Sequence, residues 1–307
     1  MKILFLGTPE SAVPILEKLI TTQHKVVGVI TQPARKSGRG LDLKESAVAE
    51  FAKQNDLKVF SPEKIDKTYF AQNLKSLDAD MAIVVAFGQI LNTDILKELR
   101  FGWINIHYSL LPKFRGAAPV QRAILQGEKE IGISFFSIEE GLDSGPIINK
   151  YPYKLSDSAT TDSVLQDLNV LATQKIEEII TGIENGLLQP KEQTDEISTA
   201  PKLNESDLRI NWNEIPLEIS RKIRAGSKRL RAWTTIGETR IKILSMKENS
   251  TEEKIDEGQI KVINKFVYVG CKNGSLILNE VIPEGKKQMD AFSWINGFQD
   301  KSNLKFS

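Results

Sequence analysis

The chain is poor in the residues that form covalent or metal cross-links. Its 307 residues include one cysteine, Cys271, and two histidines, His24 and His107. A single cysteine excludes an internal disulfide, and no spacing of His, Cys, Asp and Glu matches a metal-binding motif, so we expect no metal site. A chain of this length can bury enough apolar surface to fold without such cross-links.

Long apolar runs are also missing. No stretch of the sequence reaches the roughly 18 apolar residues of a membrane-spanning helix. The apolar run that ends at Leu6 is broken by Gly7-Thr8-Pro9 and is too short for a signal peptide. We therefore expect a cytoplasmic protein without membrane contact, and its content of 40% hydrophobic and 26% charged residues is that of an ordinary globular chain.

The net charge of +1 conceals a difference between the two parts of the chain. Residues 1–205 hold 23 Lys and Arg against 27 Asp and Glu, whereas residues 206–307 hold 18 against 13. The second part is therefore the candidate for binding an anionic partner.

Residues 1–185 alternate short apolar runs with amphipathic stretches, a pattern typical of an α/β domain with a mostly parallel sheet. A helix should begin after the first strand, with Thr8 as its cap and Pro9 at its first position. We expect strands near 3–6, 26–31, 57–60, 81–86, 103–107 and 131–138, and helices near 44–54, 64–76, 119–126 and 161–183.

The pattern changes after residue 185. Residues 186–206 are rich in polar residues and Pro, lack a period, and are predicted to be a linker. Residues 207–307 should form a second domain, a small β-barrel, because short β-like runs follow one helix. The helix is expected at 214–225 and the strands at 240–244, 259–263, 266–270 and 275–281, with a hairpin turn at Asn273-Gly274.

Two polar residues end the apolar strand at 103–107. Asn105 and His107 are two positions apart, so they share a face at the carboxyl edge of the sheet, where open α/β sheets bind ligands. The amide can donate to a developing oxyanion, and so can a protonated imidazole. The alternative is that both side chains only satisfy loop backbone. His24 lies among polar residues and is interpreted as a surface side chain.

Asp143 is the best carboxylate partner for His107. It lies in the turn Gly141-Leu-Asp-Ser-Gly145, and a carboxylate beside an imidazole raises its pKa and fixes its tautomer. A turn-capping aspartate is the alternative. The sequence has no nucleophile elbow, and the lone cysteine lies in the second domain, so the group suits a reaction whose nucleophile belongs to a substrate.

Basic residues form two groups. Arg35, Lys36 and Arg39 lie in the polar loop 32–40, and six cations lie between Arg221 and Arg231. Such density favours a polyanion-binding surface, and a solvated helix end is the alternative. A dinucleotide cofactor is disfavoured, because Gly7-Thr8-Pro9 is not followed by a Gly-x-Gly-x-x-Gly pattern.

Three motifs occur together in this order: Asn105-Ile-His107, Ser109-Leu-Leu-Pro112 with Arg115-Gly116 and Pro119, and Gly141-Leu-Asp143-x-Gly145. The combination resembles the signature of the 10-formyltetrahydrofolate-dependent formyltransferases and hydrolases. Further motifs extend the resemblance nearly end to end, toward the methionyl-tRNA formyltransferase branch: residues 5–14, 84–88, 200–203 with 210–212, and 274–289.

The resemblance implies a Rossmann-like formyl-transfer domain followed by an OB-like barrel that helps to hold tRNA. It implies transfer of a formyl group from 10-formyltetrahydrofolate to the α-amine of initiator methionyl-tRNA for translation initiation. We expect the protein to be a monomer. The implied catalytic residues are Asn105, His107 and Asp143. The implied folate contacts are Phe87, Gly88, Gln89, Ile90, Ser109, Leu110, Leu111 and Pro112. The tRNA contacts that we expect are Arg35, Lys36, Arg39, Lys44, Arg221, Arg224, Lys228, Arg229 and Arg231.

The chain departs from the family pattern at two places. Leu41-Asp42-Leu43 precede Lys44, where relatives carry further basic residues, and residues 227–231, Ser-Lys-Arg-Leu-Arg, replace a turn containing Pro and Gly. Two other functions compete: a sugar-nucleotide N-formyltransferase with the same formyl donor, and a noncatalytic RNA-binding protein that senses folate. The basic second domain favours tRNA over a sugar nucleotide.

Overall fold

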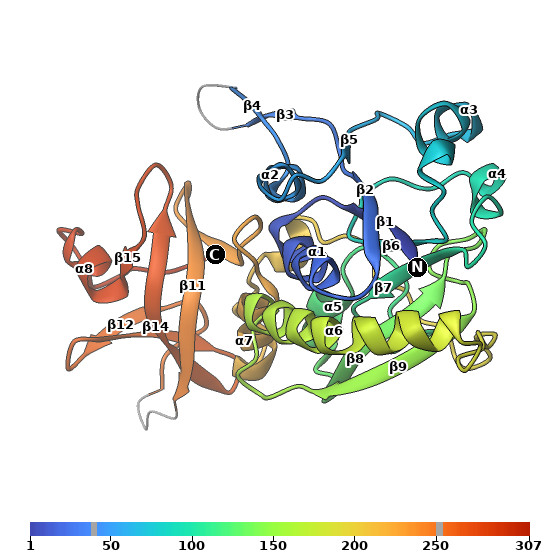
Figure 1. The fold of residues 1–307 in the computed structure, drawn as a ribbon. Helices are drawn as coiled ribbons and strands as arrows, with labels where there is room; N and C mark the ends of the chain where they lie inside the picture. The colour runs from blue at the N-terminus through green and yellow to red at the C-terminus, as the bar shows by residue number, and fades with distance from the viewer. Residues whose placement is uncertain (38–41, 250–253) are drawn as a thin grey trace. The chain divides into compact units, whose positions relative to one another are not determined.

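The computed structural model describes residues 1–37, 42–249 and 254–307. It contains two compact units, and neither is continuous along the chain (Figure 1). Unit 1 comprises Met1–Pro119, Glu130–Lys154 and Leu165–Ala200. Unit 2 comprises Val120–Lys129, Leu155–Val164 and Pro201–Ser307.

Unit 1 is built on a seven-stranded sheet in the order β5-β2-β1-β6-β7-β8-β9. The strands from β5 to β7 pair in parallel, and β8 and β9 are antiparallel. This confirms the mostly parallel α/β architecture. The strands are β1 (Lys2–Gly7), β2 (Lys25–Ile30), β5 (Val59–Phe60), β6 (Met81–Val85), β7 (Trp103–His107), β8 (Glu130–Ser137) and β9 (Ile147–Lys154).

Helices lie between and after these strands along the chain, and none in the described ranges has the length and apolar character needed to cross a membrane. They are α1 (Val13–Ile20), α2 (Ala47–Gln54), α3 (Lys67–Tyr69), α4 (Thr93–Leu96), α5 (Pro119–Gln126) and α6 (Thr161–Glu184), with short turns η1 (Glu10–Ala12), η2 (Phe70–Leu74) and η3 (Lys75–Leu77). The long helix predicted at 161–183 is α6. The helix predicted at 64–76 is instead divided among α3, η2 and η3.

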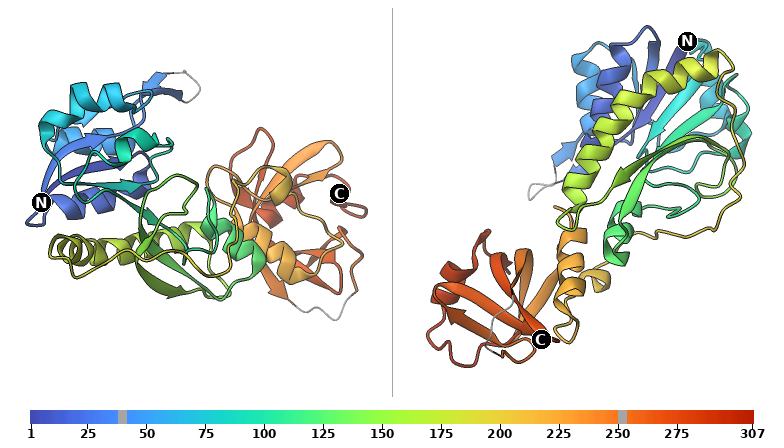
Figure 2. Two further views of the ribbon diagram at one scale, coloured as in Figure 1. Left: turned by 90° about the vertical axis from the view of Figure 1, so that its right-hand side faces the viewer. Right: turned by 90° about the horizontal axis from the view of Figure 1, so that it is seen from below.

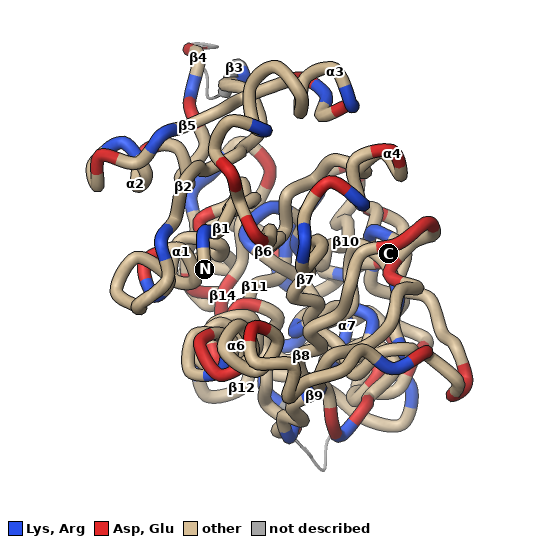
Figure 3. Tube along the Cα trace, turned by 45° about the vertical axis from the view of Figure 1, so that its right-hand side comes forward, with Lys and Arg blue, Asp and Glu red and all other residues tan. Residues whose placement is uncertain are grey.

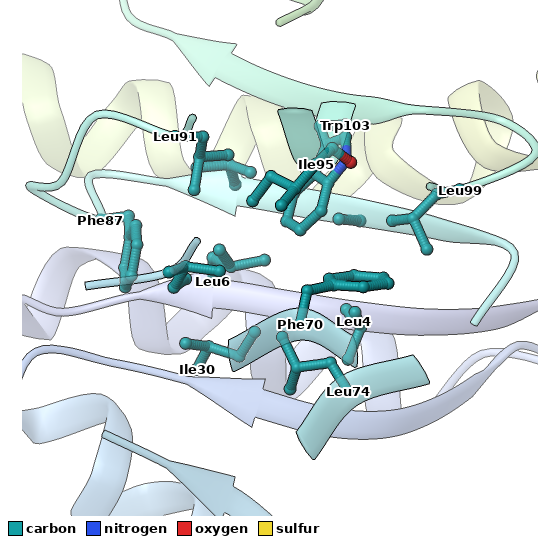
Figure 4. Close-up of a cluster of buried hydrophobic side chains, with 13 residues drawn as sticks. Leu4, Leu6, Ile30, Phe70, Leu74, Phe87, Leu91, Ile95, Leu99 and Trp103 are labelled. Carbon is teal, nitrogen blue, oxygen red and sulfur yellow. The ribbon is translucent and has the colours of Figure 1, made fainter. Parts of the chain in front are cut away.

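The sheet of unit 1 is buried on both faces. Alternate side chains of β1 point to opposite faces, and Leu4 and Phe5 are both fully buried. On one face Leu4, Leu6 and Ile30 pack with Phe70 and Trp103 in a continuous apolar cluster (Figure 4). This packing fixes the positions of the strand ends, on which the candidate site is built.

The first helix starts later than the sequence predicts. Residues 10–12 form η1, for which Pro9 is the cap, and α1 begins only at Val13. Thr8 is not the cap of η1, and its hydroxyl donates to the carbonyl of Phe87 at 2.8 Å. Thr8 therefore ties the end of β1 to the segment that follows β6.

The polar loop predicted at 32–40 carries a short hairpin. Strand β3 (Arg35–Ser37) pairs with β4 (Asp42–Lys44), and Arg39 lies outside the described residues. Because β4 takes up residues 42–44, the helix expected from residue 44 begins at Ala47, and the Ser46 side chain caps it by accepting from the Ala49 N–H at 3.0 Å.

Unit 2 contains a six-stranded sheet whose strand pairs are all antiparallel (Figure 2). Its elements are η4 (Ser206–Leu208), α7 (Pro216–Ala225), β10 (Trp233–Ile236), β11 (Thr239–Asn249), β12 (Ile260–Ile263), β13 (Phe266–Cys271), β14 (Gly274–Pro283), β15 (Met289–Asp290) and α8 (Ala291–Asn296). The predicted helix and four strands are present. The predicted hairpin turn joins β13 to β14, with Asn273 at φ +61°.

Unit 2 includes two segments that lie before residue 165 in the chain, residues 120–129 and 155–164, and polar contacts hold them there. Arg122 forms two hydrogen bonds of 3.0 Å with the carboxylate of Asp207. The Thr161 hydroxyl donates to the carbonyl of Ala225 at 2.9 Å. These contacts hold residues 120–129 and 155–164 against the segment that carries α7.

The predicted linker, residues 186–206, divides between the two units at Ala200. Lys191 pairs with Ile147, and Thr199 pairs with Arg115. Residues 191–200 are therefore an ordered strip along unit 1, which the polar composition did not indicate.

Candidate functional site

The site centres on the end of β7. His107 is the last residue of β7 and is 6% exposed, and Asn105 is half-buried on the same face of the strand. Within the described part of the chain, the Asn105 side chain makes no hydrogen bond. Its amide is therefore available to a ligand.

Both ring nitrogens of His107 face acceptors. Nε2 lies 2.9 Å from the carbonyl oxygen of Phe114, and because a carbonyl only accepts, Nε2 carries the hydrogen. Nδ1 lies 3.6 Å from Oδ2 of Asp143. The edge of Phe136 packs against the imidazole ring, with centroids 6.4 Å apart.

Burial lowers the pKa of His107 from its ordinary value of 6.5, and the Asp143 carboxylate and the Phe114 carbonyl oppose this shift only in part. The neutral imidazole is therefore favoured near neutral pH. This differs from the protonated form expected from the sequence, because the sequence does not reveal how deeply the ring is buried.

Asp143 is brought to His107 by the loop that follows β8. The loop that follows β8 begins beside the first residue of β7, where the Ile138 N–H donates to the Trp103 carbonyl at 2.7 Å. The loop then returns to place Asp143 at the last residue of β7. Asp143 has φ +50°, and its Oδ2 accepts from the Gly116 N–H at 2.7 Å.

Residues 87–90, one segment expected to contact folate, contain both buried and solvent-exposed residues. Phe87 is buried, and its carbonyl accepts from Thr8 and from the Gln32 side chain. Gly88 has φ +82°, and the Ile90 side chain is 95% exposed. Gly88 and Ile90 are therefore accessible to a ligand, whereas Phe87 is buried and its carbonyl anchors the segment to Thr8 and Gln32.

The second segment expected to contact folate, residues 109–112, is held by hydrogen bonds to Ser134 of β8. The Ser134 hydroxyl donates to the Ser109 carbonyl at 2.7 Å and accepts from the Leu111 N–H at 3.0 Å. Ser109, Leu111 and Pro112 are buried, and the Ser109 hydroxyl donates to the Lys113 carbonyl. Leu110, which is half-buried, has the most accessible side chain of the four.

The basic hairpin of unit 1 is exposed where the structure describes it. Arg35 donates to the Gln32 side chain at 3.0 Å, and Lys44 is exposed. Lys36 lies in β3, but the structure does not describe its side chain, and Arg39 lies outside the described residues.

The basic residues of α7 are engaged within unit 2. Lys222 forms an ion pair with Glu214 at 2.6 Å, and Arg224 donates to the Ala159 carbonyl at 3.0 Å. The guanidinium of Arg221 packs on Gly127, where an added Cβ would lie 2.1 Å from its Nη2. These contacts give all three side chains structural roles in unit 2.

The turn after α7 is different. Residues 227–230 form a turn in which the Ser227 N–H donates to the Leu230 carbonyl at 2.8 Å, and Lys228 and Arg229 are exposed. Neither side chain forms an ion pair with a described residue, whereas Arg231 lies 3.9 Å from Asp162. Figure 3 shows the basic positions along and after α7.

The Phe114 carbonyl is a site component that sequence analysis missed. It is a backbone group in the loop after β7, and no side-chain pattern marks it. Throughout residues 1–37, 42–249 and 254–307, no group of three or more His, Cys, Asp or Glu is arranged to hold a metal ion.

Comparison with known proteins agrees with this architecture. Residues 1–180 match the family model described as formyl transferase, and residues 202–299 match that of the formyl transferase C-terminal domain. An N-formyltransferase from Helicobacter canadensis, solved with folinic acid and dTDP-3-aminofucose, has a similar fold, with a TM-score of 0.68 and 23% identity over 91% of this chain and 98% of that chain.

Relatives at higher identity cover nearly the whole chain. A methionyl-tRNA formyltransferase from Corynebacterium efficiens is 38% identical over 97% of both chains. One from Mycobacteroides abscessus is 39% identical, also over 97% of both. The chain therefore belongs to the methionyl-tRNA formyltransferase family of formyl transferases.

Proposed function

We propose that this enzyme transfers the formyl group of 10-formyltetrahydrofolate to the α-amine of methionine esterified to initiator tRNA. The observation that carries the proposal is the placement of His107 beside Asp143, 3.6 Å apart, with the free amide of Asn105 on the same strand. Two relatives that match 97% of the chain are named methionyl-tRNA formyltransferases, which supports the formyl transfer to methionyl-tRNA.

In the proposed reaction the α-nitrogen attacks the formyl carbon, and the bond from that carbon to N10 breaks. The amine loses a proton, and N10 gains one as tetrahydrofolate leaves. Asn105 donates to the oxygen that becomes negative in the tetrahedral intermediate; one such donor is worth about 3 kcal/mol. A proton taken up by His107 at Nδ1 is stabilised by Asp143, which also helps, through a water, to carry the proton toward N10.

The two substrates have different surfaces in this proposal. The folate lies against residues 87–90 and 109–112, where Gly88, Ile90 and Leu110 are the accessible groups. The tRNA contacts the basic hairpin and the turn after α7. In this proposal unit 1, which holds most of the predicted domain 1–185, carries out formyl transfer, and unit 2, which contains the OB-like domain predicted at 207–307, helps to bind tRNA. The protein acts as a monomer in the cytoplasm.

The chief alternative acceptor is an amino sugar attached to a nucleotide, as in the Helicobacter canadensis structure. Lys228 and Arg229, exposed and without an acidic partner among the described residues, favour a polyanion over a single small nucleotide.

The proposal is tested by incubating the purified protein with 10-formyltetrahydrofolate and each acceptor separately. We expect blocked α-amines on charged initiator tRNA and no formylated sugar nucleotide. Formylation of the sugar alone would overturn the choice of acceptor. Folate binding without turnover on either acceptor would indicate a noncatalytic protein.

A further inference from the structure

Gln193 differs from its neighbours in the strip along unit 1. Lys191, Glu192 and residues 194–197 are exposed, whereas Gln193 is half-buried. Pairing at Lys191 with Ile147 and at Thr199 with Arg115 fixes the strip on either side of it. Among residues 191–197, Gln193 is thus the one side chain that is not exposed, and its hydrogen bonds give the physical reason.

The Gln193 amide uses its full hydrogen-bonding capacity. Its Nε2 donates to the carbonyls of Asp143 at 2.9 Å and Gly145 at 2.7 Å. Its Oε1 accepts from Arg115, at 3.1 Å from Nε and 2.7 Å from Nη2. An amide has two donor hydrogens and two acceptor lone pairs, so all four are satisfied.

These four bonds join the two segments that hold His107. Phe114, whose carbonyl accepts from Nε2 of His107, precedes Arg115 directly. Asp143 places Oδ2 3.6 Å from Nδ1 of His107. Gln193 therefore links the segments that carry the two groups on opposite sides of the imidazole.

The strip supports the same two segments at further points. The Ser198 hydroxyl accepts from the Phe114 N–H at 2.9 Å, and the Ser198 carbonyl accepts from the Arg115 N–H at 2.9 Å. Gly116, the next residue, donates to Asp143. A change at Gln193 is therefore transmitted to Asp143 and Phe114 and not only to the surface.

We propose that Gln193 is a positioning residue for formyl transfer, which clamps the Asp143 turn to the Arg115 loop and thereby fixes the orientation of His107. The inference rests on the proposed function, since it assumes that His107 and Asp143 act in that reaction.

Two variants of Gln193 distinguish a role of its hydrogen bonds from a role of its packing. Gln193→Met keeps the side-chain length and removes all four hydrogen bonds, whereas Gln193→Glu keeps the acceptor for Arg115 and replaces the donor to both carbonyls with an oxygen. We expect kcat to fall roughly 10- to 100-fold in each, with little change in KM for tRNA, because a displacement of about 1 Å at a catalytic group can cost about 100-fold.

Gln189→Met is the matched control. Gln189 is exposed in the same part of the chain, and its amide donates only to the Gly186 carbonyl at 3.0 Å. We expect wild-type kcat for this variant. Thermal unfolding of all three variants shows whether each one folds.

A second measurement does not depend on activity. The chain has two histidines, so nitrogen-15 spectra of the imidazoles report His107 with His24 as an internal reference. Loosening both acceptors should lower the pKa of His107 further in Gln193→Met and leave that of His24 unchanged. An unchanged His107 signal together with wild-type kcat would overturn the clamp, while inactivity of the wild-type protein toward methionyl-tRNA would instead overturn the proposed function.

Discussion

The Nδ1 atom of His107 lies 3.6 Å from Oδ2 of Asp143, and the opposite ring nitrogen donates to the carbonyl of Phe114. The imidazole is thus held between a carboxylate and a carbonyl, and burial favours its neutral form. This arrangement prepares the ring to accept a proton at Nδ1 without changing its orientation.

Replacing His107 with Ala should lower turnover far more than tRNA binding. We expect a loss of roughly 100-fold in kcat, because the ring acts on the reacting atoms and is not one of the basic groups that bind phosphate. Single-turnover formylation and tRNA binding, measured on the same preparation, check this. Comparable losses in both would refute the role assigned to His107.

The stability of the protein should decrease on mild acidification. His24 is 4% exposed and is therefore not the surface side chain that the sequence suggested. Burial lowers the pKa of both His24 and His107 below 6.5, so below that pH the unfolded chain binds protons that the folded chain does not. The free energy of unfolding should therefore fall as pH decreases from about 6.5 toward the lowered pKa values, by at most about 1.4 kcal/mol per pH unit for each histidine.

Urea unfolding at about pH 7.5 and about pH 5.5 measures this effect, and the variants His24→Gln and His107→Gln assign it. Each variant should reduce the pH dependence of the free energy of unfolding by the contribution of the histidine that it replaces. A pH dependence equal to that of the wild-type protein in both variants would contradict the explanation. Activity should fall over the same range, because the attacking amine must be neutral.

Lys228 and Arg229 should carry the electrostatic part of tRNA binding on the second unit. Replacing both with Ala should weaken tRNA binding and reduce the slope of log Kd against log salt by about one for each phosphate that the variant no longer neutralises. Lys222→Ala is the control, because Lys222 is already paired with Glu214. Equal salt slopes for the wild-type protein, the double variant and Lys222→Ala would show that the turn does not contact tRNA.

Gly132→Ala should disturb the folate segment without touching His107. A Cβ at Gly132 would lie 2.2 Å from the Tyr151 carbonyl oxygen and 2.6 Å from Cδ2 of Leu110. We expect a loss of roughly 1–3 kcal/mol in stability from overpacking. KM for the formyl donor should rise, because Leu110 must move.

The control for this variant is Gly102→Ala. Gly102 has φ +73° and no neighbour within 4 Å of an added Cβ. It should lose about 1 kcal/mol of stability from backbone strain and keep its KM for the donor. An unchanged KM in Gly132→Ala would show that the Leu110 segment does not contact the donor.

The periodic parts of the chain were predicted well from sequence. The long helix α6 begins at Thr161, as its apolar spacing predicts, and the hairpin at Asn273 follows from local turn chemistry. The helix start at Thr8 was wrong: the first helical turn has Pro9 as its cap, and the Thr8 hydroxyl donates to the Phe87 carbonyl, a tertiary contact that the local sequence does not reveal. The linker prediction at 186–206 rested on polarity alone, which does not distinguish a free segment from a strip paired to a neighbour.

The sequence by itself determined which chemical groups the protein has: one amide and one imidazole on a shared strand face, a carboxylate in a glycine-bounded turn, and an excess of cations late in the chain. These follow from residue identity and the local geometry of a strand. The tertiary structure alone decided that Asp143 returns to His107, that the ring is buried and neutral, and that Gln193 joins the two loops, because these relations depend on packing between segments far apart in the chain.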